Sequence, residues 1–386
     1  MRLASVFVVL RAERAISAAT DQPAWLVIDE DYVLQPEANS YLAALRARDR
    51  SVNTERVYAG RIALYLSYCQ RTGLDWRAPS IDALSGFLRH LVTEPLPPRG
   101  RNPTAARYRS KGTANAVMTV VCELLRFGSA QGWASPSVVN GLTEPKFLVH
   151  TPPGFNAGEQ GQFREISANT IKFAVPHCGF QWLSDDQVEQ LMSAEMRPRD
   201  RFLVGLMAVT GMRIGEVLGL RREDMHLLAR AQDLGCQVRG AHVHVRRRVN
   251  TNGALAKSRY PRTIPVPDEV VGLYADYQHE RYQTGNDDSD MMFINQFRPP
   301  VGQPMTYSNA KDLFDRLSQR LGFRVRPHML RHTAANSWRR QGVPRDVMQD
   351  LLGHVSCSSM QPYFHPTDGE KRQAVEKVAA LRGGGR

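Results

Sequence analysis

The sequence predicts a mainly α protein, in which an all-α domain is followed by a mixed α+β domain with a small antiparallel sheet. Apolar residues recur with helical spacing through most of the chain. A stretch with several Pro and Gly residues at 145–180 separates two parts, and β-branched residues around 241–266 predict the sheet. Because 386 residues exceed the usual size of one domain, two compact units and a linker are expected.

The composition is that of a folded protein with a basic excess. Hydrophobic residues make up 42% of the chain and charged residues 23%, so there is enough apolar material for a core. The chain has 50 Lys and Arg against 38 Asp and Glu, a net charge of +12, which favours a polyanionic partner such as nucleic acid. A solvated basic surface would give the same balance, so the motifs must decide between the two.

A cytoplasmic location is expected. The apolar start of the chain is interrupted by Arg11, Glu13 and Arg14, which disfavours a secretion signal, and no stretch is long enough for a membrane span. The five cysteines show no CxxC pair and no neighbouring His at zinc spacing, which favours reduced thiols and no metal site. These cysteines are Cys69, Cys122, Cys178, Cys236 and Cys357.

The N-terminal part is expected to be an extension, residues 1–36, followed by a helical domain, residues 37–144. Its helices should cover about 37–48, the residues after Ser51 and Thr54, about 81–92 and about 113–131. Basic residues crowd the loop and the helix start before position 111, where they could hold phosphate or simply be solvated. The candidate DNA-binding residues of the chain are Thr54, Arg56, Arg107, Arg109, Lys111 and Arg259.

After the linker, residues 145–180, helical patterning resumes with a capping box that begins at Ser184. A buried helix should follow at 202–209. Two strands are expected over 241–249 and 255–266, joined by the turn Asn-Thr-Asn-Gly. The C-terminal third of the chain returns to helices.

Two segments of this second part carry cations suited to a phosphate. Gly211 is expected to end one helix and Arg213 to stand at the start of the next, where a guanidinium and backbone N–H groups can converge on an anion. Alone this signal is weak, because such an Arg is usually solvated or paired with a carboxylate such as Glu216. Lys257 follows the predicted turn and could protonate a leaving oxygen, although by itself it reads as surface charge.

Two further segments lie near the C-terminus. In PHMLRHTAAN the spacing sets His328 and Arg331 on one helical face, although a non-catalytic helix-turn-helix would look similar. In LLGHVSCSSMQPYFH, Gly353 is expected to end a helix and to be followed by His354 and Tyr363. A single Tyr of this kind is most often a core residue, so this segment indicates a catalytic site only in combination with the other three.

Together these segments resemble the tyrosine recombinase (phage integrase) family over about residues 182–378. TGMRIGEVLGLRRED is similar to the family's first arginine box and AKSRYPRTIPV to its lysine hairpin. HMLRHTAA is similar to its His-x-x-Arg box and LLGHVSCSSMQPYFH to its His-to-Tyr box, in the family's order. The helical segment resembles the core-binding domain more weakly, and the long linker and a longer stretch after Asp224 depart from the common pattern.

The resemblance implies a core-binding domain at 37–144 and a catalytic domain with a C-terminal docking segment at 181–386. It implies a site-specific recombinase that cleaves and rejoins double-stranded DNA through a 3′-phosphotyrosine, without metal, cofactor or ATP. Tyr363 would be the nucleophile. The implied catalytic residues are Arg213, Lys257, His328, Arg331, His354 and Tyr363.

Two other functions remain open at this stage. A type IB topoisomerase uses a similar residue set and acts as a monomer, and a DNA-binding regulator would need neither Lys257 nor Tyr363. The recombinase reading implies a homo-tetramer on two DNA sites, bridged by the segment after the nucleophile, with accessory DNA-bending proteins as optional partners. Fewer than forty residues precede the helical domain, so no separate arm-site domain is expected, which favours a transposon-borne or simple recombinase.

Overall fold

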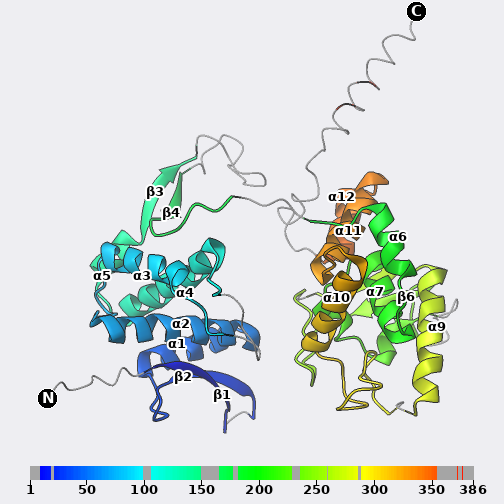
Figure 1. The fold of residues 1–386 in the computed structure, drawn as a ribbon, viewed down its shortest axis with the longest axis horizontal. Coiled ribbons are helices and arrows are strands. Elements are labelled where there is room, and N and C mark those ends of the chain that lie inside the picture. The colour runs from blue at the N-terminus through cyan, green and yellow to red at the C-terminus, as the bar shows by residue number, and fades with distance from the viewer. Residues whose placement is uncertain are drawn as a thin grey trace, which may run out of the picture. The chain divides into compact units, whose positions relative to one another are not determined.

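The computed structural model describes residues 9–18, 21–98, 106–148, 165–176, 181–227, 235–258, 260–285 and 288–353, together with Arg372 and Glu376. The chain forms two compact units, and the described residues up to 176 belong to the first and those from 181 to the second (Figure 1). Helices dominate both units, so the mainly α prediction is confirmed. No helix of the described residues has the length and apolar character needed to cross a bilayer.

The first unit is built around four long helices at the predicted places. Ser51, Ser80 and Ser110 each cap a helix by accepting a hydrogen bond from the backbone N–H three residues later. Tyr65 and Phe87 are fully buried in the core that these helices share, with ring centroids 5.2 Å apart. The helices are α1 (Pro36–Ala47), α2 (Val52–Thr72), α3 (Ile81–Thr93), α4 (Lys111–Ala130) and the short α5 (Pro136–Gly141).

Two antiparallel hairpins in this unit differ from the prediction. β1 (Arg11–Ile16) pairs with β2 (Pro23–Ile28) inside the expected extension. β3 (Thr143–Phe147), which begins at the end of the expected helical domain, pairs with β4 (Glu165–Asn169) inside the expected linker. The first hairpin packs on α2, where the Leu10 N–H donates to the Ser67 hydroxyl over 2.9 Å. Neither β1 nor β3 alternates apolar and polar residues, so their sequences carry no strand period.

The second unit surrounds the buried helix α7 with other helices and one small sheet. Phe202 of α7 stacks on Tyr277 and Phe293, and α7 packs on α9 and α11. The Ser184 capping box is present as predicted. The helices are α6 (Asp185–Ser193), α7 (Pro198–Thr210), α8 (Ile214–Val217), the 3-10 turn η1 (Arg222–Asp224), α9 (Asp268–Gln283), α10 (Tyr307–Leu321), α11 (Pro327–Arg340) and α12 (Arg345–Leu352).

The sheet is antiparallel, in the order β5 (Met225–His226), β6 (His242–Val245) and β7 (Arg262–Pro265). The predicted pair of strands is therefore present but shorter than expected. Backbone pairing stops at the Val245 and Arg262 pair, and the residues between these strands form a connection that carries Lys257. β-branched residues continue past Val245, which is why the sequence pattern overestimates the length of the strands.

Candidate active site

Four of the six predicted catalytic residues lie within the described part of the second unit. Arg213 is the N-cap residue of α8, and His328 and Arg331 lie in the first turns of α11. Lys257 is exposed on the connection between β6 and β7. Burial lowers the pKa of His328, and the positive charges of Arg331, Arg213 and Lys257 lower it further, so these four side chains interact electrostatically. His354 and Tyr363 lie outside the described residues.

Arg331 is buried, with 2% of its surface exposed, and it joins the ends of two helices. Its Nη1 donates to the carbonyl of Gly211 over 2.8 Å, and its Nη2 donates to the carbonyl of Leu352 over 2.7 Å. Gly211 and Gly353 end α7 and α12 in the left-handed conformation, each with φ of 61°, as predicted. The guanidinium therefore fixes the point at which the chain leaves α12.

Glu216 is the acidic centre of the site and is almost fully buried. Its Oε2 accepts from the Arg213 backbone N–H over 2.9 Å and from Arg262 Nη2 over 2.8 Å, and its Oε1 accepts from Arg213 Nη1 over 3.2 Å. Burial alone would raise the pKa of Glu216, but hydrogen bonds and charge from Arg262 and Arg213 outweigh it and lower that pKa. The sequence suggested the pair with Arg213, whereas the part of Arg262 was missed.

Arg262 extends this network to the end of α12. Its Nε donates to the carbonyl of Leu351 over 3.0 Å, so it holds the same helix end as Arg331. A Cβ atom on Gly353 would lie 2.7 Å from Arg262 Nη1 and would displace that guanidinium, and the left-handed φ of 61° also favours glycine at this position. The carboxylate of Glu216 thus links Arg213 to the start of the segment that carries His354 and Tyr363.

We expect Glu216→Gln to lower the free energy of unfolding by about 3 kcal/mol, because it leaves buried Arg262 without a counter-charge. Glu223→Gln is the matched control, since Glu223 is largely exposed and pairs with Arg248 at the surface, where such pairs contribute below about 1 kcal/mol. Urea unfolding followed by circular dichroism measures both. Equal midpoints for Glu216→Gln and the wild type would contradict a stabilising role of the charge.

The same network gives a pH dependence with a definite sign. Because the folded-state pKa of Glu216 is lowered, its stabilisation is present above the pKa of the unfolded chain and is lost as the pH falls through the folded-state value. Wild-type protein should therefore lose more stability on acidification than Glu216→Gln does.

The candidate DNA-binding residues that the structure describes lie at the starts of α2 and α4. Arg56, Arg107 and Lys111 are exposed, and Arg109 is half-buried, which lowers its pKa. Thr54 lies beside the N-cap, with its hydroxyl 2.9 Å from that of Ser51. Arg259 lies outside the described residues.

The expectation that no histidine lies near a cysteine is wrong. The sequence shows no His at the usual zinc spacing from a Cys, yet the Cys236 Sγ lies 3.3 Å from His242 Nε2 and 3.5 Å from His244 Nε2. The signal was available in the pattern His-x-His, because alternate residues of a strand share one face.

Comparison with known proteins supports the sequence resemblance. The phage integrase family matches residues 181–370. Transposase A from transposon Tn554 of Staphylococcus aureus is 27% identical over 370 residues, which cover 92% of this chain and 94% of the transposase. Tyrosine recombinase XerA of Pyrococcus furiosus is 27% identical over 201 residues, 52% of this chain and 62% of that protein.

Solved structures share the fold. The Tn1549 transposon integrase, in complex with a circular intermediate DNA, is similar with a TM-score of 0.58 and 14% identity, over 88% of this chain and 99% of that one. A lambda integrase dimer bound to a core site gives a TM-score of 0.54 and 15% identity, over 86% and 97% of the two chains.

Proposed function

Because the chain is a site-specific tyrosine recombinase of the phage integrase family, we propose that it cuts and rejoins DNA through a 3′-phosphotyrosyl intermediate at Tyr363, without metal or ATP. The observation that carries this proposal is that Arg213 and Arg331 both donate to the carbonyl of Leu352, over 3.5 and 2.7 Å. The positive charges of Arg331, Arg213 and Lys257 also lower the pKa of His328. The four side chains come from three separate segments of the chain. A solvated charge run or a non-catalytic helix-turn-helix would not need such a grouping.

The two arginines are suited to hold the scissile phosphate. A guanidinium matches two phosphate oxygens and keeps its charge at any physiological pH. Carbonyls at the ends of α7 and α12 orient Arg331, and Glu216 orients Arg213, so both cations are positioned before DNA arrives. Preorganised charge of this kind stabilises the transition state most effectively, because no reorganisation is needed as negative charge grows.

His328 is suited to accept the proton of the nucleophile. Its lowered pKa keeps the imidazole neutral near pH 7, and a neutral imidazole has a free lone pair for a proton or a hydrogen bond. His354, by the family resemblance, would donate a hydrogen bond to the phosphate. Lys257 would then protonate the departing 5′-oxygen, a role that its exposed position on a connection permits.

The proposed reaction needs no energy source, because each bond that breaks is replaced by one of the same kind. The phenolic oxygen of Tyr363 forms a bond to phosphorus while the bond from phosphorus to the 5′-oxygen breaks, and that oxygen takes a proton from Lys257. One phosphodiester replaces another, so a 5′-hydroxyl can attack the phosphotyrosine and reverse the step. A nicked DNA substrate should trap the covalent adduct, because the short fragment that carries the new 5′-hydroxyl dissociates after cleavage, and mapping the junction would identify the target site. Absence of any adduct would reject the proposal.

We further propose that the enzyme acts in the cytoplasm.

We also propose that four chains act on two DNA sites, bridged by the segment after Tyr363. Exchange between two duplexes needs four cleavages, each by one tyrosine. Val375, Val378 and Leu381 share a helical spacing and lie outside the described residues. These three side chains can bury only a small apolar area, and at about 25 cal/mol per Å² the free energy of docking is too small to hold free chains together. Binding to adjacent DNA sites must therefore raise the local concentration of the chains.

Deleting the chain after Arg372 should then spare binding to a single site in a gel shift while abolishing two-site synapsis and recombination. Replacing the charged Lys377 by Ala, within the same segment, is the matched control and should leave synapsis intact. Normal recombination by the truncated chain, or efficient plasmid relaxation by an isolated monomer, would instead favour the topoisomerase reading.

A further inference from the structure

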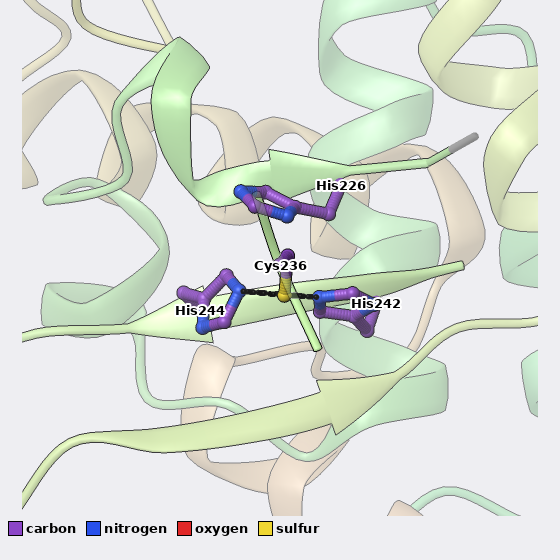
Figure 2. Close-up of side chains that lie close together, drawn as sticks. All are labelled: His226, Cys236, His242 and His244. Atoms are coloured by element: carbon purple, nitrogen blue, oxygen red, sulfur yellow. Dashed lines mark hydrogen bonds between the residues drawn. The ribbon is translucent and has the colours of Figure 1, made fainter. Parts of the chain in front are cut away.

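A cluster of three histidines and one cysteine lies in the second unit, and the proposed DNA chemistry uses none of them. His226 lies on β5, Cys236 precedes β6, and His242 and His244 lie on β6. Each can offer one ligand atom, and these four atoms all lie within 4.8 Å of one another. Figure 2 shows the three rings gathered around the sulfur of Cys236.

The sheet explains why these side chains meet. His242 and His244 are two residues apart on one strand, so their side chains point to the same face. β5 is antiparallel to β6 with His226 directly opposite His242, which places the third ring on that face, 5.0 Å from the His242 ring. The segment before β6 then brings Cys236 to the three rings.

Backbone hydrogen bonds fix the protonation of two of the histidine rings, so that each ring directs a nitrogen lone pair toward the cluster. His242 Nδ1 lies 2.7 Å from the carbonyl oxygen of Gly240, and His226 Nε2 lies 3.1 Å from the carbonyl oxygen of Glu223. A carbonyl only accepts, so both nitrogens must carry the proton, and the other nitrogen of each ring is left with a lone pair. Carbonyl partners of this kind are typical of metal-bound histidines, whose tautomer they set.

A metal-free cluster does not explain the state of His226 Nδ1, which is buried. This nitrogen has no hydrogen-bond partner. Protons on the thiol and on one ring could satisfy the contacts among Cys236, His242 and His244, but they would still leave that lone pair buried and unused.

The distances fit a tetrahedral ion. His242 Nε2 and His244 Nε2 lie 3.1 Å apart, and the Cys236 sulfur lies 3.3 and 3.5 Å from them. Ordinary zinc bond lengths place ligand atoms of a tetrahedron about 3.3 Å apart for two nitrogens and about 3.6 Å apart for nitrogen and sulfur. The His226 ring, whose ligand atom lies within 4.8 Å of the other three, must move inward to complete four ligands.

We propose that His226, Cys236, His242 and His244 bind one structural Zn²⁺. Imidazole nitrogens and a thiolate are the ligands that zinc prefers, and four protein ligands leave no open position for chemistry on the metal. On binding, the Cys236 thiol loses its proton to solvent and zinc takes its place on sulfur. The ion ties β5 and the segment before β6 to the strand that leads into the Lys257 connection, and it leaves the proposed metal-independent cleavage unchanged.

The test uses the intact chain, expressed in zinc-containing medium and purified without chelator. Elemental analysis should find about 1 zinc per chain. After exchange with Co²⁺, the protein should show a thiolate-to-cobalt charge-transfer band and the strong visible bands of tetrahedral cobalt. Protein that is folded by circular dichroism, holds no zinc and takes up neither Zn²⁺ nor Co²⁺ under reducing conditions would overturn the proposal.

Variants locate the ion. Cys236→Ser and His242→Ala should lower bound zinc to below about 0.1 per chain, and Cys236→Ser should remove the charge-transfer band. His279→Ala is the matched control, because His279 is an exposed histidine on α9, and it should keep the full zinc content. A chelator should lower the melting temperature of the wild type and of His279→Ala, but not that of Cys236→Ser. An unchanged cobalt spectrum in Cys236→Ser would place the ion elsewhere and reject this site, and the wild-type measurements decide the matter if a variant does not fold.

Discussion

Tyr363→Phe should form no covalent adduct with a nicked DNA substrate, a loss of at least about 10³-fold, while its affinity for the same DNA stays unchanged. The substitution removes only the attacking oxygen. Arg213, Arg331 and the groups that orient them are left in place, so the phosphate should still be bound. A denaturing gel measures the adduct, and a gel shift measures binding.

Tyr282→Phe is the matched control for this experiment. Tyr282 is 77% exposed at the end of α9 and belongs to no proposed catalytic group, so its variant should form the adduct at the wild-type rate. An adduct in Tyr363→Phe would move the nucleophile to another residue. A loss of DNA binding in that variant would instead mean that the tyrosine also holds the substrate.

Local signals in the sequence predicted much of the fold. Ser51 and Ser184 cap helices where hydroxyl residues precede an amphipathic pattern, and Gly211 ends α7 because glycine tolerates the left-handed conformation. Such signals act within a few residues and need no knowledge of the rest of the chain. The hairpin of β1 and β2 is different, because packing on α2 stabilises it and its own sequence shows no alternation.

In the candidate site, too, local features were predictable from the sequence and contacts between distant segments were not. The helical spacing of His328 and Arg331 predicted that they share a face of α11, whereas their proximity to Arg213 came from the family resemblance, since no local pattern encodes contacts between distant segments. The contacts of Glu216 with Arg262 and of Cys236 with the histidines join segments that are distant in the sequence. The first requires α8 to lie against β7, and the second requires the register that pairs β5 with β6 and sets His226 opposite His242.

The other large effect is expected at the leaving group. Lys257→Ala should slow cleavage of an ordinary phosphodiester by about 10²–10⁴-fold, because the 5′-oxygen would depart without a proton. On a substrate with a bridging sulfur in place of that oxygen, the loss should stay below about 10-fold, since a thiolate leaves readily unprotonated. Adduct formation under single-turnover conditions measures both rates.

Comparing the two substrates separates proton transfer from simple charge. If Lys257 acted only as a positive charge near the phosphate, its removal would slow cleavage of both substrates equally, because the negative charge of the transition state is present in each. Lys311→Ala is the matched control, since Lys311 is an exposed lysine of α10 paired with Asp315, and it should change neither rate. Equal losses in Lys257→Ala would therefore remove Lys257 from the acid role and pass that role to another donor near the 5′-oxygen, for which His328 would be the next residue to test.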